Sequence, residues 1–272
     1  MITTEPTPGS PCWTDLGAPD VPAAAAFYSA VLGWEYQSMG DEGGGMEGGM
    51  FQKDGKTVAG LGKLSEEGAR SAWMIYFCVT DADATTRAVQ NAGGTVRVAP
   101  RDLDDWGRMA QYSDPLGGQF AVWQPGTNKG FELVEAPGSL SWTELYTSDA
   151  TSAKEFYGGV FGWQFGDMEV PGGGGTYSLI TPPGLPEERM FGGMMELSKE
   201  DLALANGVPY WHPVFNVTDC DAAVAKVTEN GGSVQMGPED VESVGRLAVC
   251  LDPSNADFVV LTPAPPATSA GS

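Results

Sequence analysis

Two pairs of residues could together hold a small molecule: Trp13 with Asp15, and Trp142 with Glu144. Residues two apart on a strand point to the same side, so each pair would present an indole and a carboxylate to one surface. An indole is a flat apolar wall for stacking a planar molecule, and a carboxylate beside it favours a positive group on that molecule. Alternatively, both tryptophans are ordinary core residues and both acids face solvent, since aromatic residues in strands are mostly core.

Both pairs lie inside a segment that occurs twice. Residues 8–34 and 137–163 share the framework W-T-x-L followed by F-Y-x-x-V-x-G-W. A second block repeats further on, as Trp73–Val96 and Trp211–Val234. A repeat of this length corresponds to a whole domain, so we expect the chain to hold two similar domains.

Each domain shows the same order of elements twice: a strand pattern, a helix, and then three more strand patterns. Asp20 and Pro22 begin the first helix and Gly33 ends it. Asp54-Gly55 marks a hairpin between two of the strands. Each domain is therefore expected to contain two βαβββ units, which predicts an α+β fold of four such units in two similar domains.

The domain boundaries follow from composition. We expect the first domain at 8–124, a linker at 125–138, the second domain at 139–263 and a disordered tail at 264–272. The linker begins and ends near Pro-Gly pairs, and the tail has too few apolar residues to pack a core. The linker should let each domain keep a core of its own.

Composition narrows the classes of partner. The chain of 272 residues has a net charge of −22, from 14 Lys+Arg against 36 Asp+Glu, so it should repel nucleic acid and anionic membranes. This charge either attracts a cationic small molecule or is a solvated acidic surface. No apolar run is long enough to span a bilayer, and the first residues lack a signal-peptide pattern. The four cysteines form no CxxC pair, so we expect reduced thiols and a cytoplasmic location.

Three motifs, each with a counterpart in the second half, carry a resemblance to a known family. They are "FYSAVLGW" (27–34), "VTDADATTRAVQNAGG" (79–94) and "DPLGGQF" (114–120). Together they resemble the vicinal oxygen chelate superfamily, which holds glyoxalases, bleomycin-resistance proteins and extradiol dioxygenases. The resemblance implies that each pair of βαβββ units curls into a cup that holds a metal or a small organic ligand. It also implies two domains about a pseudo-twofold axis, so that a monomer contains an internal pseudo-dimer.

The resemblance also places the metal ligands of the family's enzymes. Three ligand positions can be located in each domain, and they are occupied by Trp13, Met74 and Ala121, and by Trp142, His212 and Val259. A fourth would lie in Val58–Gly62 or Phe191–Glu196. Of the residues at these six positions, only His212, the single histidine of the chain, can bind a metal. A catalytic divalent site needs about three protein ligands. We therefore expect no metal and no other cofactor.

Strand alternation from these positions predicts the surface of each cup. The candidate ligand-binding residues are Trp13, Asp15, Met74, Tyr76, Trp123, Trp142, Glu144 and His212. The set offers aromatic side chains, one methionine and one carboxylate per cup, which suits an aromatic organic molecule, including a cationic one. His212 is interpreted as a metal-free pocket residue, as a neutral structural histidine, or as a general base.

Two functions of different classes stay open. The first is binding of a small aromatic molecule in metal-free cups, as in bleomycin-resistance-like proteins. The second is an enzyme of the glyoxalase/dioxygenase superfamily: a metal-dependent lyase or dioxygenase, or a cofactor-free tailoring enzyme that uses His212, Asp15 or Glu144. Two-domain members of the family are often labelled hydroxylase or glyoxalase. The sequence assigns no catalytic residue and no particular ligand.

Overall fold

The computed structural model describes residues 1–40, 47–64, 69–170, 174–203 and 207–265, so most of the expected tail lies outside the described residues. Its first half contains β1 (Pro11–Ala18), α1 (Val21–Leu32), β2 (Glu35–Ser38), β3 (Gly48–Lys53), β4 (Lys56–Lys63), β5 (Ala72–Cys78), α2 (Ala82–Asn91), β6 (Thr95–Leu103), β7 (Gly107–Ser113) and β8 (Gln119–Pro125).

The second half repeats this order and adds a short 3-10 turn (Glu187–Arg189) and α4 (Lys199–Ala203). It contains β9 (Leu140–Thr147), α3 (Ala150–Phe161), β10 (Gln164–Glu169), β11 (Thr176–Thr181), β12 (Gly192–Glu196), β13 (Tyr210–Asn216), α5 (Cys220–Glu229), β14 (Ser233–Val241), β15 (Gly245–Leu251) and β16 (Asp257–Pro263). The predicted α+β fold of four βαβββ units is confirmed.

Local signals fix where the helices begin and end. The side chain of Asp20 accepts a hydrogen bond from the amide of Ala23, and Gly33 ends α1 with a left-handed φ of 69°. Asp149 and Gly162 do the same for α3. The predicted ends of the first helix are therefore confirmed.

Each half forms one eight-stranded sheet, in the order β2-β3-β4-β1-β5-β8-β7-β6 and its equivalent β10-β11-β12-β9-β13-β16-β15-β14. The first strand of every unit lies at the centre, where β1 pairs antiparallel with β5 and β9 pairs with β13. The tryptophan–acid pairs on β1 and β9 therefore lie in the middle of their sheets. Cup 1 denotes the face of the first sheet that carries Trp13 and Asp15, and cup 2 the face of the second sheet that carries Trp142 and Glu144.

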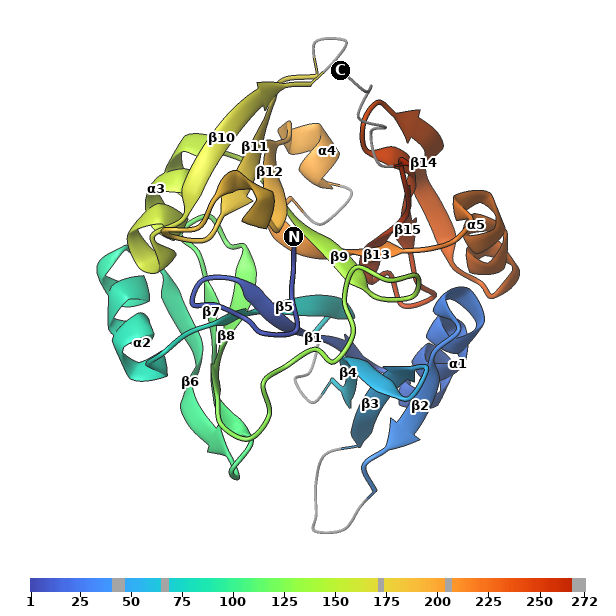
Figure 1. The fold of residues 1–272 in the computed structure, drawn as a ribbon, viewed down its shortest axis with the longest axis horizontal. Helices are drawn as coiled ribbons and strands as arrows, with labels where there is room; N and C mark the ends of the chain where they lie inside the picture. The colour runs from blue at the N-terminus through green and yellow to red at the C-terminus, as the bar shows by residue number, and fades with distance from the viewer. Residues whose placement is uncertain (41–46, 65–68, 171–173, 204–206, 266–272) are drawn as a thin grey trace, which may run out of the picture.

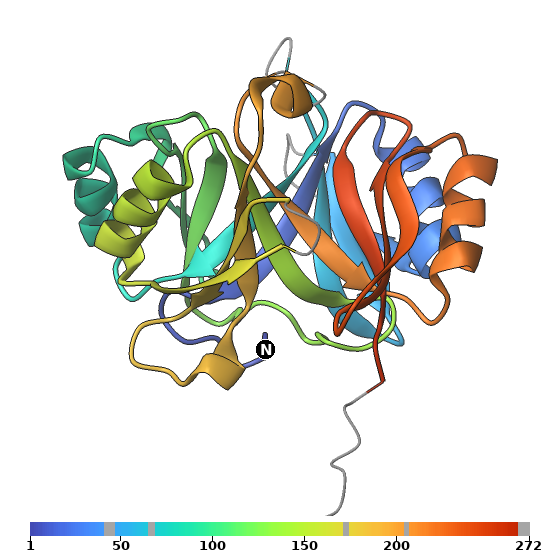
Figure 2. The same cartoon turned by 90° about the horizontal axis from the view of Figure 1, so that it is seen from above.

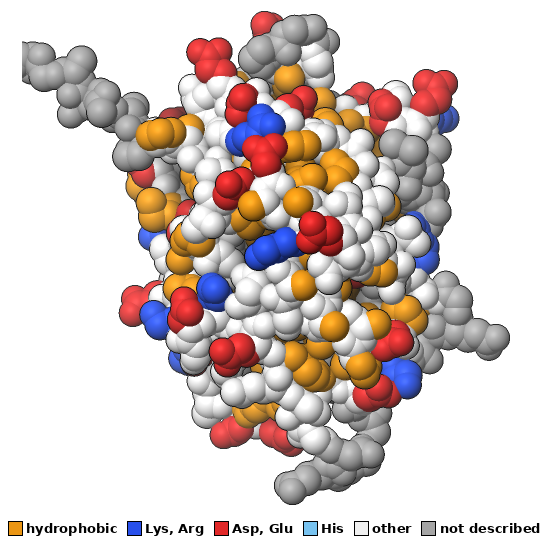
Figure 3. Space-filling model, turned by 90° about the vertical axis from the view of Figure 1, so that its right-hand side faces the viewer, with side chains coloured by type: hydrophobic (Ala, Val, Ile, Leu, Met, Phe, Trp, Pro, Cys, Tyr) orange, Lys and Arg blue, Asp and Glu red, His pale blue; other side chains and the backbone are white. Residues whose placement is uncertain are grey.

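The helices pair between the two halves. Helix α1 packs against α5 and α2 against α3, at the two ends of the molecule, with the strands between them (Figures 1 and 2). Among the described residues no helix is long and apolar enough to span a membrane. On the face in Figure 3 acidic side chains outnumber basic ones and are scattered rather than gathered in one patch.

The two halves share one aromatic core, with contacts that are exchanged between them. Trp34 of the first half meets Phe215 of the second, with ring centroids 5.2 Å apart, and Trp163 meets Phe77 at 4.9 Å. The indole Nε1 of Trp34 also donates to the Gly138 carbonyl, as that of Trp163 donates to Gly9. This reciprocity is what a pseudo-twofold axis requires. The expectation that each domain has a core of its own is wrong, because one buried cluster contains residues of both halves.

Phe77→Ala should lower the free energy of unfolding by about 3–5 kcal/mol, the usual cost of deleting a buried aromatic ring. Because Phe77 also contacts Trp163 and Trp211 of the other half, calorimetry should show one melting transition that moves as a whole. The exposed control Val244→Ala should leave it in place. Two separate transitions, of which only one moves, would contradict a shared core.

Candidate functional site

The structure brings the predicted residues of cup 1 together. Trp13 pairs in register with Tyr76, and Asp15 with Met74, across β1 and β5. Trp123 on β8 pairs in register with Cys78 on β5, two residues beyond Tyr76. Along β1, the half-buried Trp13 and Asp15 alternate with the fully buried Thr14 and Leu16, which face the shared core. The two groups thus point to opposite faces of the sheet.

Asp15 is the titratable group of cup 1. Its carboxylate accepts a hydrogen bond of 2.7 Å from the hydroxyl of Tyr76, which in turn lies 3.5 Å from the Gln111 amide nitrogen. Burial raises the pKa of Asp15 to about 6, and the Tyr76 hydrogen bond opposes only part of that rise. With no basic partner among these contacts, the carboxylate is poised to gain from a positive charge brought by a ligand.

The segment between the two domains forms a wall of cup 1. Phe131 donates its amide to the Cys12 carbonyl at 2.9 Å, and its ring lies 5.8 Å from that of Trp13. The Nε1 of Trp123 donates to the Asn128 carbonyl at 3.0 Å. Trp123 is only 6% exposed, so it lies behind this segment, whereas Trp13 keeps a partly open face.

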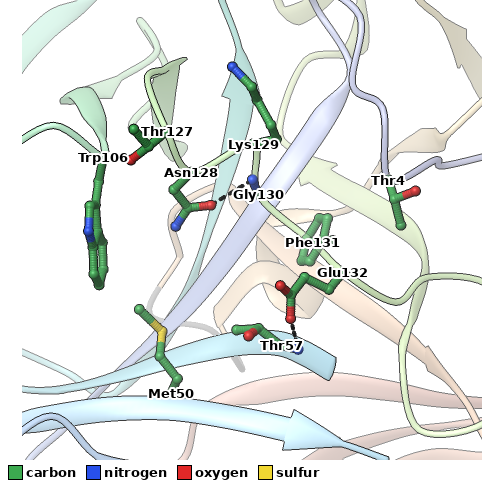
Figure 4. A pocket seen from close by; sticks show the side chains of 10 residues that line it. All are labelled: Thr4, Met50, Thr57, Trp106, Thr127, Asn128, Lys129, Gly130, Phe131 and Glu132. Atoms are coloured by element: carbon green, nitrogen blue, oxygen red, sulfur yellow. Dashed lines mark hydrogen bonds between the residues drawn. The ribbon is translucent and has the colours of Figure 1, made fainter. Parts of the chain in front are cut away.

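A cavity of about 650 Å³ opens along the same segment (Figure 4). Met50 on β3 and Trp106 in the β6–β7 turn point into it from opposite sides. Its lining residues are Thr4, Met50, Thr57, Trp106, Thr127, Asn128, Lys129, Gly130, Phe131 and Glu132. None of the eight sequence-predicted residues is among them, because the sequence marks this segment only as a linker.

Cup 2 holds a connected polar network. The His212 Nε2 lies 2.9 Å from the Glu144 carboxylate, and its Nδ1 hydrogen-bonds the Asp257 carboxylate. The other oxygen of Glu144 accepts from the Tyr177 hydroxyl at 2.6 Å, and the Nε1 of Trp142 donates to that hydroxyl at 2.8 Å. The predicted residues Trp142, Glu144 and His212 therefore come together, but their polar atoms are already paired with one another.

His212 is fully buried between two acids, and this decides its charge. Burial alone would lower its pKa, but the carboxylates of Asp257 and Glu144 outweigh it and raise the pKa to about 9. The pKa of Glu144, which burial would raise, is held below its ordinary value by His212 and the Tyr177 hydrogen bond. His212 is thus a cation at neutral pH with both nitrogens donating, rather than the neutral histidine or the base that the sequence left open.

Several residues of cup 2 escaped the sequence analysis. They are Tyr146, Tyr177, Tyr210 and Asp257. The rings of Tyr146 and Tyr210 contact His212 edge-on, with centroids 4.7 and 5.6 Å away. Strand alternation continued by one step would have found Tyr146 after Glu144 and Tyr210 before His212. Tyr177 comes from another strand, and no local signal marks it.

These features define a protein with two domains of paired βαβββ units, each with a cup at its centre. Two family models match it: "Glyoxalase-like domain" over residues 13–123, and "Glyoxalase/Bleomycin resistance protein/Dioxygenase superfamily" over residues 139–260. The chain belongs to the glyoxalase/bleomycin resistance protein/dioxygenase superfamily.

Relatives match over almost their whole length. "Anthracycline biosynthesis protein DauV" of Streptomyces sp. (strain C5) is 37% identical, covering 93% of each chain. "Putative glyoxylase CFP32" of Mycobacterium tuberculosis (strain CDC 1551 / Oshkosh) is 37% identical, covering 94% of this chain and 96% of its own.

Solved structures share the fold at low identity. The 2,3-dioxygenase LapB from Pseudomonas sp. KL28 superposes with a TM-score of 0.62 at 15% identity, covering 98% of this chain and 96% of its own. The Mn(II)-bound glyoxalase from Novosphingobium aromaticivorans gives 0.61 at 17% identity, covering 95% and 88%.

The residues at the family's ligand positions do not fit a metal ion. Trp13, Met74 and Ala121 in cup 1, and Trp142 and Val259 in cup 2, leave His212 as the one nitrogen ligand, and both of its nitrogens are taken by carboxylates. The neighbouring strands add no ligand at the positions in register with Asp15 and Glu144, because these positions are Gly60 and Gly193. Within the described residues no group of three or more His, Cys, Asp or Glu side chains is placed to hold a metal.

His212→Gln should lower the free energy of unfolding at pH 7 by about 3–5 kcal/mol, because it leaves two buried carboxylates without their cation. The folded pKa of about 9 lies above the ordinary 6.5, so the charge of His212 stabilises fully below pH 6.5 and this contribution is lost as pH rises through 9. Urea unfolding should therefore show a large difference in the free energy of unfolding between the unmodified protein and the variant near neutral pH. The difference should be smaller at pH 10. A difference in the free energy of unfolding that does not change with pH would mean that His212 is uncharged in the folded protein.

Proposed function

We propose that this member of the superfamily binds a small aromatic organic molecule in a metal-free cup. The observation that carries the proposal is the pairing, at the centre of cup 1, of a partly open indole, Trp13, with an enclosed carboxyl, Asp15, whose hydrogen-bonding partner is Tyr76. Aromatic and sulfur-containing side chains dominate the surrounding wall, as is usual where an apolar ligand is oriented by a few polar groups.

The relatives' names support an aromatic ligand. Two proteins named for anthracycline biosynthesis, from Streptomyces sp. (strain C5) and Streptomyces peucetius, match 93% of this chain at 37% and 36% identity. Anthracyclines are polycyclic aromatic compounds, and their flat ring systems suit stacking on an indole. The net charge of −22 further favours a ligand with a positive group.

A cofactor-free enzyme is the second candidate, and Asp15 favours it. A carboxyl with a pKa of about 6 exchanges a proton readily near neutral pH, as a general acid or base must. His212 is unsuited to that role, since it is already protonated and fully paired. A tailoring reaction in this protein would therefore rely on Asp15 in cup 1.

The proposal includes the location of the protein in the cell, its oligomeric state and its partners. The four cysteines are free and buried, which agrees with a reducing, cytoplasmic environment. The reciprocal contacts between the halves supply within one chain what a dimer interface supplies between two, which favours a monomer. The acidic surface argues against nucleic-acid and membrane partners.

Trp13→Ala should weaken binding of an anthracycline about tenfold or more, since one aromatic stacking contact is worth roughly 1–3 kcal/mol. The measurement is quenching of tryptophan fluorescence during titration, together with the melting temperature of the same variant. Trp13→Phe keeps a planar ring and should retain most of the affinity. If Trp13→Ala binds as tightly as the unmodified protein while melting earlier, Trp13 is only a core residue.

Protein purified without chelators should contain well under one equivalent of Zn, Ni, Fe or Mn by mass spectrometry, because too few side chains at the ligand positions can bind a metal. A stoichiometric metal that is lost in a His212→Gln variant would refute the metal-free proposal.

A further inference from the structure

The two cups differ at the position beside the acid. In each sheet the strand next to the acid carries a glycine in register with it: Gly60 on β4 beside Asp15, and Gly193 on β12 beside Glu144. A glycine there leaves a gap in the inner face of the sheet. What fills this gap decides whether a cup is open to a ligand.

In cup 2 the gap is filled by the protein itself. A Cβ placed on Gly193 would overlap the ring of Tyr177, so this ring lies directly over the glycine. The Tyr177 hydroxyl meanwhile bonds both Glu144 and Trp142. A ligand entering here would have to displace the half-buried Tyr177 ring and break its hydrogen bonds to Glu144 and Trp142, which carries a desolvation cost.

In cup 1 no tyrosine stands at the equivalent place. Tyr177 on β11 pairs with Met195, two residues beyond Gly193, and the corresponding residue on β3 is Gly48, which pairs with Gly62, two residues beyond Gly60. The atoms nearest to a Cβ on Gly60 are the Asp15 Cβ at 3.0 Å and the edge of the Trp13 indole at 3.4 Å. Neither overlaps this Cβ as the Tyr177 ring overlaps that of Gly193, so they border the gap rather than fill it.

The gap in cup 1 lies next to residues that line the large cavity. Met50, which lines the cavity, pairs in register with Gly60, and Gly60 pairs with Asp15. Neighbouring strands lie about 5 Å apart, so Met50 and Asp15 are roughly 10 Å apart with only a glycine between them. Phe131 lines the cavity from the other side and contacts Trp13. The cavity therefore adjoins the gap through two of its lining residues, Met50 beside Gly60 and Phe131 beside Trp13.

Asp15 decides which charge this space favours. The charged residues of the cavity lining, Lys129 and Glu132, are opposite in sign and each bonds the backbone, at Gly126 and Thr57. Their effects on a ligand largely offset each other. Asp15 adds a carboxylate with a single hydroxyl donor, so the site as a whole favours a cation.

We propose that cup 1 alone binds the ligand: a planar aromatic cation lies over Gly60, between Trp13 and Met50, with its positive group toward Asp15. Cup 2 is closed by Tyr177 and serves as a structural half. This inference rests on the proposed function and adds to it the site, a stoichiometry of one ligand per chain, and the charge of the ligand.

The test is isothermal titration of the full chain with two planar probes of similar shape, proflavine, which is cationic at neutral pH, and acridone, which is neutral. The unmodified protein should bind one equivalent of proflavine. Gly60→Leu should weaken both probes at least tenfold by filling the gap, whereas the matched control Gly159→Leu, at an exposed position of α3 with open space around it, should change neither.

Asp15→Asn, which keeps the shape of the side chain, provides a second variant should Gly60→Leu fail to fold. It should weaken proflavine about tenfold, the usual effect of losing a charged partner, and leave acridone within about twofold. Two equivalents of proflavine, or one equivalent retained by folded Gly60→Leu, would overturn the one-cup assignment and leave the proposed function standing. Equal losses for both probes in Asp15→Asn would overturn the preference for a cation. Failure of the unmodified protein to bind either probe would overturn the inference and the proposed function together.

Discussion

The aromatic core between the two halves is the interaction on which the rest of the structure depends. Both sheets bury one face in it, through exchanged contacts such as Trp34 with Phe215 and Trp163 with Phe77. A strand that commits alternate residues to this core must turn the others to the opposite face. The two cups therefore exist because the halves pack on each other, and their central residues come from the strands that the core holds most firmly, β1 and β9.

The two cups have the same backbone arrangement but different chemistry. In cup 2 a buried imidazolium, His212, is held between Glu144 and Asp257, and Tyr177 completes the network. The strand position of His212 is taken by Met74 in cup 1, so Asp15 there has no cation and keeps a raised pKa. One half is thus saturated with internal contacts, whereas the acid of the other half has a neutral tyrosine hydroxyl as its hydrogen-bond donor and no cation.

The same residues explain how this chain departs from the metal-dependent members of its superfamily. Five of the six placed ligand positions hold apolar side chains, two of them tryptophans, so the cup surfaces suit stacking better than coordination. In cup 2 the positive charge beside the acid comes from the protein's own histidine, whereas the side-chain hydrogen bond to the acid of cup 1 comes from a neutral tyrosine. The segment between the domains has gained a role as well, since Phe131 and Asn128 build a wall of cup 1 rather than only connecting two units.

The repeat, the order of the βαβββ units and the face of the central strands that lines each cup follow from the amino-acid sequence. These depend on local signals: helix caps such as Asp20 and Gly33, and the alternation that places Trp13 with Asp15. The shared core, the wall formed by Phe131, the position of Tyr177 over Gly193 and the charge of His212 arise only when the chain is folded. Each of these depends on which distant strands and segments meet, and a pKa depends on the burial and charges that such meetings create. No local pattern in the chain records those meetings.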